Sequence, residues 1–367
     1  MPDPERISVG GKMRPGPGFA RSDQLFDGLL AYGRRLPREG FEGGSVSLKT
    51  WLYRSTGIFV SAFFVYLAVR QVNLSESLRV LGTVQPWWLV AAVLVYLSSF
   101  PVRALRWRLI LRVQKVLSLR ELMAPVFVGY TVNNVLPARA GEIYRAHFLG
   151  RRAGMSRSGV AASIVVERTF DGLMLVCVIF LVFVLFPQEQ YLGGTALITG
   201  LIFLALAAGI LFYSLTVDKS HQVIDRGLGL LPLALRELLV GRLGFFLRGI
   251  RGISTVGGFL EAGIYTTLVW ILDACAVALV VVSFGVTLPL VGFVLVFALV
   301  ALSTTLPSGP GYVGPFQYAF VVALGPFAVS RETALAISVA AQLALLGSVT
   351  LIGLALLLKE QLRAPGR

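Results

Sequence analysis

The feature that most constrains the fold is a series of long apolar stretches separated by short basic segments. A helix of about 20 apolar residues matches the hydrocarbon core of a bilayer. The apolar positions are continuous rather than alternating, which excludes a transmembrane β-barrel. We therefore predict an all-α, polytopic integral membrane protein with about 6–8 transmembrane helices. Candidate spans lie at 52–70, 86–104, 160–186, 194–217, 261–284 and 333–358.

The composition excludes several classes of protein. Hydrophobic residues make up 56% of the chain and charged residues 14%, against roughly 25% charged in a soluble domain. A soluble globular enzyme would need far more polar surface. The net charge of +14 is expected at a membrane surface rather than on nucleic acid. Cys177 and Cys275 lie in apolar stretches and predict neither a disulfide framework nor a metal site. No familiar catalytic motif occurs, so we expect no enzymatic activity and no cofactor.

The distribution of Lys and Arg predicts the orientation of the chain. Basic residues concentrate in the polar head, in two internal segments, in an amphipathic segment and in the tail, whereas 187–193 and 285–289 contain none. We therefore expect both termini on the cytoplasmic side of the cell (inner or plasma) membrane. The predicted organisation is a partly disordered cytoplasmic head at 1–50, a membrane domain at 51–358 with a cytoplasmic amphipathic segment at 218–260, and a cytoplasmic tail at 359–367.

Two apolar stretches are interrupted by Pro and Gly. The first, 121–137, lies between segments 103–120 and 138–159, which are both basic and both expected to be cytoplasmic. It cannot then cross once, so we predict a re-entrant hairpin. The second, 288–328, is broken around Pro307 to Gly311. Irregular backbone at membrane depth must be buried in protein or line a wet cavity.

The two breaks share the pattern Leu-Pro-x-x-x-Gly, at 136–141 and at 306–311, and both follow small amide or hydroxyl residues. Paired Gly/Pro-interrupted segments in corresponding halves indicate a transporter built from inverted repeats. The alternative is coincidence, since Leu-Pro and Gly are common in membrane proteins.

Charged residues in apolar context are few, and each is costly at membrane depth. Glu167 and Asp171 are four residues apart and share a helix face, with Arg168 three residues from Asp171. The formal charges of the set of six residues named below sum to zero. These residues could therefore neutralise one another and exchange partners with a charged substrate. Structural ion pairing at the membrane edge is the alternative. The set comprises Arg139, Glu142, Arg145, Glu167, Arg168 and Asp171.

Polar and glycine residues at the breaks complete the candidate site. They could bind a head group or present backbone N–H groups to an anion. A purely structural role is the alternative, in which amides satisfy freed backbone groups and glycines form a tight tip. The residues are Asn133, Asn134, Thr304, Gly309, Gly311 and Tyr312.

Three segments resemble the lysylphosphatidylglycerol synthase transmembrane (flippase-like) family: Gly129 to Arg145, Val166 to Asp171, and Pro307 to Gly314. The resemblance covers roughly 50–358. It implies a membrane module that moves lipids between leaflets, and in some members this module is fused to a soluble aminoacyl transferase domain. It also implies phospholipid, glycolipid or polyprenyl-phosphate substrates, without selecting among them.

The functional hypothesis is a lipid flippase or scramblase-like transporter whose two breaks form a polar cavity. The alternatives are a membrane-embedded transferase acting on a lipid-linked sugar and a non-transporting membrane subunit. The expected partners are membrane lipids, either an anionic phospholipid or a polyprenyl-phosphate-linked lipid, and no nucleic acid. A homo-oligomer is left open.

Overall fold

The computed structural model describes residues 48–136, 140–185, 255–306 and 308–362. Within these ranges the fold is all-helical, as predicted. In the described part of the chain, three helical segments are long and apolar enough to cross a membrane: Pro86–Leu111, Val256–Val282 and Arg331–Glu360. The predicted spans at 52–70 and 160–186 are also helical, whereas 194–217 and 218–254 lie outside the described residues.

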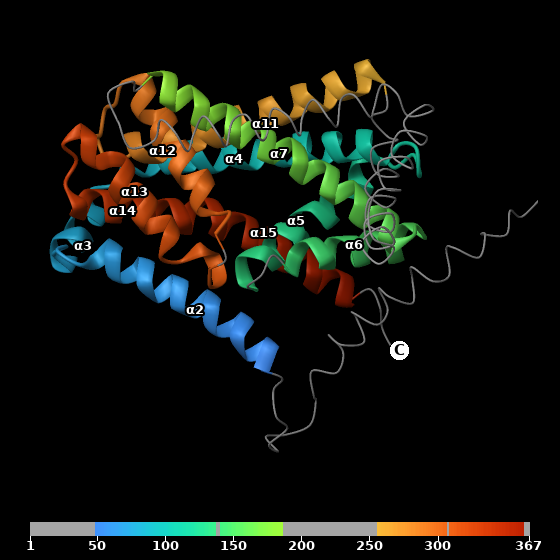
Figure 1. The fold of residues 1–367 in the computed structure, drawn as a ribbon, viewed down its shortest axis with the longest axis horizontal. Helices are drawn as coiled ribbons and strands as arrows, with labels where there is room; N and C mark the ends of the chain where they lie inside the picture. Colours follow the sequence, from blue (N-terminus) through green and yellow to red (C-terminus); the bar gives the residue numbers. More distant parts are fainter. Residues whose placement is uncertain (1–47, 137–139, 186–254, 307, 363–367) are drawn as a thin grey trace, which may run out of the picture.

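The described helices follow the order that the apolar stretches predict, and those that are consecutive within a described range are joined by short turns (Figure 1). Several begin at a capping side chain, such as Ser118 at α5 and Ser330 at α14. A π-helical turn, Gln342–Leu346, joins the last two α-helices. The bounds are α2 Leu48–Val69, α3 Leu74–Gly82, α4 Pro86–Leu111, α5 Leu119–Val135, α6 Ala140–Ala153, α7 Arg157–Leu185, α11 Val256–Val282, α12 Leu290–Ser303, α13 Pro315–Leu324, α14 Arg331–Ala341 and α15 Gly347–Leu362.

The first break is a helix hairpin made of α5 and α6. These helices pack closely because Gly141 has no side chain: a Cβ there would lie 1.9 Å from the Gly129 carbonyl oxygen. The backbone N–H of Gly141 donates to Asn133 Oδ1 at 2.8 Å. The tip residues 137–139, which include Pro137 and Arg139, lie outside the described residues.

The second break forms a hairpin from α12 and α13, joined by the short 3₁₀ turn Pro310–Tyr312. Gly311 and Gly314 have φ angles of +67° and +98°, which glycine adopts without strain. A Cβ at Gly314 would lie 2.4 Å from the Ser61 carbonyl oxygen of α2. The glycine-rich segment is therefore a tight turn packed against α2.

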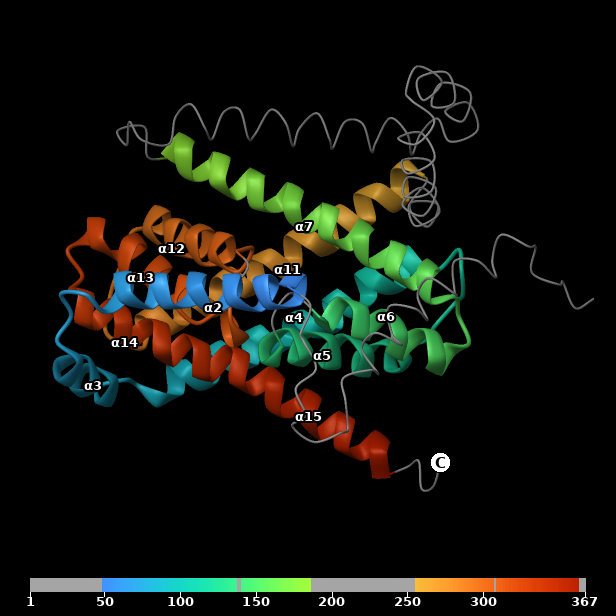
Figure 2. The same ribbon diagram turned by 60° about the horizontal axis from the view of Figure 1, so that its bottom comes forward.

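The two hairpins occupy opposite ends of the molecule in both views (Figures 1 and 2). The α5–α6 hairpin lies at the end that carries the turns after α4 and α6. This end, called the basic end below, carries Arg112, Lys115, Arg151, Arg152 and Arg157. The α12–α13 hairpin lies at the other end, beside α3. The hairpins therefore enter the helix bundle from opposite directions.

The packing of the helices follows an inverted repeat. If α4 to α7 correspond to α11 to α15, each main contact has a counterpart: α5 packs on α15, and α12 packs on α7. Helices α4 and α11, which are equivalent, pack on each other along their length. The bundle has two apolar cores, one around Trp107 and one around Phe320; each is built mainly by one half and includes a residue of the other, Val349 and Ala92 respectively. This is the architecture that the paired breaks suggest.

One sequence prediction needs correction. The sequence predicts a basic loop at 103–120, but α4 continues to Leu111 and buries the side chains of Arg103 and Arg106. The helix continues because carboxylates of α7 and α11 neutralise these arginines inside the bundle. The last helix, α15, extends to Leu362.

The hairpin arrangement predicts sidedness of labelling. In a background lacking Cys177 and Cys275, which are both exposed, single cysteines would be placed at Val116, Ser156 or Leu78. Val116→Cys and Ser156→Cys flank the α5–α6 hairpin at the basic end, so an impermeant maleimide should label both from one side. Leu78→Cys in α3 should label from the other side. Opposite sidedness of Val116 and Ser156 would show that the segment crosses the membrane.

The close approach at Gly141 predicts a stability defect. Gly141→Ala forces a methyl group against backbone, and overpacking of this kind typically costs about 1–3 kcal/mol. Gly263→Ala in α11 is the matched control, because a Cβ there meets nothing within 4 Å. Thermal unfolding in detergent should show a lower midpoint for Gly141→Ala alone. Equal midpoints for the two variants would contradict the tight packing of the hairpin.

Candidate functional site

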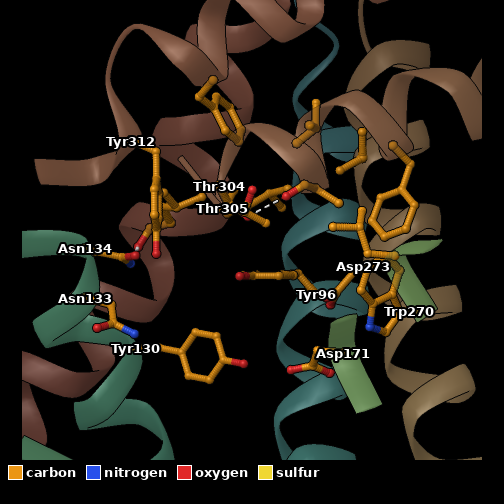
Figure 3. A pocket seen from close by; sticks show the side chains of 18 of the residues that line it. Tyr96, Tyr130, Asn133, Asn134, Asp171, Trp270, Asp273, Thr304, Thr305 and Tyr312 are labelled. Carbon is orange, nitrogen blue, oxygen red and sulfur yellow. Dashed lines mark hydrogen bonds between the residues drawn. The ribbon is translucent and has the colours of Figure 1, made fainter. Parts of the chain in front are cut away.

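A cavity of about 280 Å³ lies where the two hairpins approach each other inside the bundle. Both breaks contribute to it: Asn133 and Asn134 from the end of α5, and Thr304, Thr305 and Tyr312 from the turn after α12 (Figure 3). Gly311 lies beside this contact, since a Cβ added there would lie 3.8 Å from the Asn134 carbonyl oxygen. Residues 170 positions apart, Asn134 and Thr304, thus line one pocket.

The neutral polar wall of the pocket is held by hydrogen bonds to neighbouring helices. Asn134 Nδ2 donates to the Leu346 carbonyl at 3.3 Å and to Thr350 Oγ1 at 3.0 Å, which attaches α5 to the α14–α15 segment. Asn133 closes the first hairpin through Gly141. Gln342 Nε2 donates to the Gly311 carbonyl at 2.6 Å. These amides satisfy freed backbone groups and also border the pocket.

Glu167 and its partner Arg106 lie beside this pocket with side chains that are both 0% exposed. Arg145 of α6 binds the two oxygens of Glu167 at 3.1 and 2.9 Å, and Arg106 of α4 approaches Oε1 at 3.2 Å. The Arg145 guanidinium carbon also lies 3.6 Å from the centre of the Trp107 ring. Glu167 therefore connects α4, α6 and α7 below the floor of the pocket.

A second layer of ion pairs borders the pocket itself. Asp171 accepts from Arg106 at 2.6 Å and from Arg168 at 3.0 Å. Arg168 also contacts Glu142, with 2.9 Å between Nε and Oε1. Arg168, Asp171 and Glu142 all line the pocket, so this layer presents both signs of charge to whatever enters.

Sequence reasoning missed a third group of charges. Arg103 of α4 donates to Asp273 of α11 and to the hydroxyl of Tyr130 of α5. All three line the pocket, together with Tyr96 and Trp270. The basic pattern alone assigns Arg103 to a loop. Asp273 could have been found, because it is an isolated acid inside the apolar stretch 261–284, and such residues mark functional sites.

The predicted site residues fall into three groups. Seven line the pocket: Asn133, Asn134, Glu142, Arg168, Asp171, Thr304 and Tyr312. Arg145 and Glu167 lie beneath it as a buried pair, and Gly309 and Gly311 shape the backbone of the second turn instead of lining the pocket. Arg139 lies outside the described residues. In the described charge network four arginines face four carboxylates: Arg103, Arg106, Arg145 and Arg168 against Glu142, Glu167, Asp171 and Asp273.

The fold and pocket define a polytopic membrane protein with a polar, charge-neutralised cavity between two inverted helix hairpins. Residues 55–353 match the model of the family described as the lysylphosphatidylglycerol synthase TM region, and the chain belongs to this family. This confirms the resemblance that the break motifs indicate. No solved structure matches the chain.

Three similar proteins are known by name. "Glycosyltransferase AglD" of Haloferax volcanii is 27% identical over 84% of this chain and 56% of its own length. A UPF0104 membrane protein of Methanocaldococcus jannaschii is 24% identical over 49% of this chain and 53% of its own length. The chain thus spans about half the length of these two relatives. A UPF0104 membrane protein of Methanothermobacter thermautotrophicus is 26% identical over 81% of this chain and 88% of its own length.

The first of these relatives contradicts one prediction. We expected no enzymatic activity because familiar catalytic motifs are missing, yet this relative carries the name of a glycosyltransferase. Carboxylates that face a pocket can serve catalysis without a recognisable sequence spacing, so a missing motif does not exclude an enzyme.

The buried pair beneath the pocket predicts a stability effect. Glu167→Gln keeps the side-chain volume but leaves Arg145 and Arg106 short of a counter-charge, which typically costs about 3–5 kcal/mol. Glu360→Gln is the matched control: its pair with Arg152 is exposed, and such pairs contribute about 0–1 kcal/mol. Thermal unfolding should show a large drop for Glu167→Gln only. Similar small shifts for both would mean that the Glu167 network does not stabilise the bundle.

Proposed function

We propose that this protein moves a lipid head group between the two leaflets of a membrane, as a flippase or scramblase-like transporter. The pocket between the hairpins holds the head group during passage, while the acyl chains remain in the bilayer. The family concerns lipid or lipid-linked substrates, which supports a membrane lipid as the partner. An anionic phospholipid or a polyprenyl-phosphate-linked lipid fits a pocket that contains arginines; self-association into a homo-oligomer stays a prediction.

One observation carries this proposal: the pocket is polar and charged, yet it lies where two inverted hairpins meet within an apolar bundle. The pocket therefore lies between the two ends of the molecule, from which the two hairpins enter the bundle. A head group crossing a bilayer needs a polar environment at mid-depth, because burying a polar group without partners is costly. Pockets at the interface of inverted repeats serve this purpose in transporters.

The proposed orientation places the basic end in the cytoplasm of the cell that makes the protein, in its inner or plasma membrane. At this end lie Arg112, Lys115, Arg151, Arg152 and Arg157, whereas the opposite end of the described part carries Arg70, Arg79 and Arg331. The excess of basic residues supports this orientation. The end of α15 points the same way, so the C-terminus is proposed to be cytoplasmic (Figure 2). The N-terminus is proposed to be cytoplasmic from the basic residues of the head.

A second candidate is a membrane-embedded transferase that acts on a lipid-linked sugar. It is favoured by the name of the Haloferax relative and by three carboxylates that line the same pocket, Glu142, Asp171 and Asp273. The match covers 56% of that relative, so its named activity could reside in the matched portion or in the remainder of that protein. Both candidates place a lipid-linked head group in the pocket, and they differ in whether the head group is chemically changed.

Transport is tested in proteoliposomes with a fluorescent phospholipid, by measuring how fast the label becomes accessible to an impermeant quencher. The protein should accelerate this exchange over empty vesicles. Thr304→Leu should slow it by about tenfold or more, because a head-group atom loses its polar neighbour at a cost of about 1–3 kcal/mol.

Thr267→Leu is the control, since Thr267 lies on the exposed face of α11 and does not line the pocket. It should leave the rate unchanged. An exchange rate equal to that of empty vesicles for the wild-type protein would refute transport of that lipid. Chemical change of a supplied lipid-linked sugar in the same vesicles would favour the transferase instead.

A further inference from the structure

Arg103 and Asp273 occupy equivalent positions in the two halves of the protein. They are 170 residues apart, and the same offset relates the two Leu-Pro-x-x-x-Gly breaks. It also relates two ring pairs between neighbouring helices, Phe100 with Phe127 at 4.4 Å and Trp270 with Phe297 at 5.5 Å. Helices α4 and α11 begin 170 residues apart as well, at Pro86 and Val256. The repeat therefore keeps one register through α4–α5 and α11–α12.

Equivalent residues of a two-fold repeat can touch each other only on the symmetry axis. Arg103 donates to Asp273 Oδ2, so this pair marks the pseudo-two-fold axis of the protein. The antiparallel packing of α4 and α11 around it agrees: Gln85 N–H donates to the Ser283 carbonyl at one end, and Arg112 approaches Glu261 at the other. The axis thus passes through the wall of the pocket, because both residues line it.

This pair differs from the other buried ion pairs. Glu167 and Asp171 bind arginines of α4, α6 and α7, all within the first half. Within the described part of the chain, Arg103–Asp273 is the buried pair that joins the two halves, with side chains 7% and 20% exposed. Other ion pairs between the halves, such as Arg152–Glu360, are well exposed. A relative movement of the halves acts directly on Arg103–Asp273.

Arg103 also differs from the other buried arginines in the groups that it binds. Arg145 belongs to the predicted charged set, but both of its terminal nitrogens bind Glu167 beneath the pocket. Arg168 lines the pocket but contacts two carboxylates that line it as well, Glu142 and Asp171. Arg103 forms its ion pair with a single carboxylate, and it also donates to the neutral hydroxyls of Tyr130 and Ser99. An anionic ligand that binds Arg103 therefore has to displace one carboxylate, that of Asp273.

We propose that Arg103 binds the phosphate of the lipid head group in this pocket, and that Asp273 is the resident counter-ion that the phosphate replaces. This inference rests on the proposed function and names the residues that recognise the lipid. Arg forms strong, paired hydrogen bonds to phosphate oxygens. When the pocket is empty, Asp273 prevents an uncompensated buried charge. When the lipid moves on, the Asp273 carboxylate returns to Arg103 and takes the place of the phosphate. Because the pair lies on the axis, one pair serves lipids arriving from either leaflet.

The test measures binding by titration calorimetry of the full chain in detergent. The probe is phosphatidic acid, and diacylglycerol is the matched lipid without phosphate. Asp273→Asn removes the competitor, so phosphatidic acid should bind about tenfold more tightly, while diacylglycerol binding is unchanged. Arg103→Gln combined with Asp273→Asn removes both charges together, which avoids a lone buried charge and preserves folding. This neutral pair should bind phosphatidic acid about tenfold more weakly than the wild type.

A charge exchange tests the axis itself. Arg103→Asp combined with Asp273→Arg moves the guanidinium to the equivalent position of the other half, still beside the pocket. It should bind phosphatidic acid far better than the neutral pair. Arg152→Gln, which alters an exposed pair outside the pocket, should bind like the wild type.

The outcomes separate this inference from the proposed function. Unchanged or weaker binding by Asp273→Asn, or normal binding by the neutral pair, would overturn the phosphate site even if the wild type moves lipid in vesicles. The expected binding pattern without accelerated lipid exchange by the wild type would keep the site and refute transport. Weaker binding of phosphatidic acid in the presence of inorganic phosphate would show that the phosphate itself is recognised.

Discussion

The structure depends on neutralising charge inside an apolar bundle. Glu167 is fully buried, and it is stable there only because Arg145 and Arg106 bind it from two other helices. That arrangement fixes α4, α6 and α7 relative to one another and so positions the first hairpin. Arg168 and Asp171, on the same helix as Glu167, then reach the pocket with their charges already balanced. The charge network therefore supports the fold and shapes the polar wall at once, and these two roles are not alternatives.

The second constraint is irregular backbone within a membrane domain. Hairpins that turn back at mid-depth must have their turns covered, because an unsatisfied backbone group in lipid is costly. At the end of α5, Asn134 bonds to the α14–α15 segment, and in the second turn Gly309 N–H donates to Ser61 of α2 at 2.7 Å. Asn134 also lines the pocket, whereas Ser61 and Gly309 stabilise the second turn outside it.

Much of this arrangement was predictable from the sequence. The apolar stretches predicted the helices. The prediction of a hairpin within 121–137 was only partly right, because this stretch is the single helix α5 and the second arm, α6, comes from the basic segment 138–159. The repeated Leu-Pro-x-x-x-Gly pattern predicted that Asn134 and Thr304 share a pocket. The error at Arg103 and Arg106 came from counting basic residues without knowing their partners: a buried arginine and a loop arginine look alike until Asp171 and Asp273 are placed in space. The same limit applies to Arg145, whose pairing with Glu167 depends on tertiary packing.

The central claim is that lipid head groups pass through the pocket between the hairpins. The most direct test places a single cysteine at Thr304, in a background without Cys177 and Cys275, and measures lipid exchange in the same vesicles before and after reaction with a bulky maleimide. Leu78→Cys, on the exposed face of α3, is the control. The account predicts that modification at Thr304 stops exchange while modification at Leu78 does not. Undiminished exchange after complete modification at Thr304 would contradict it.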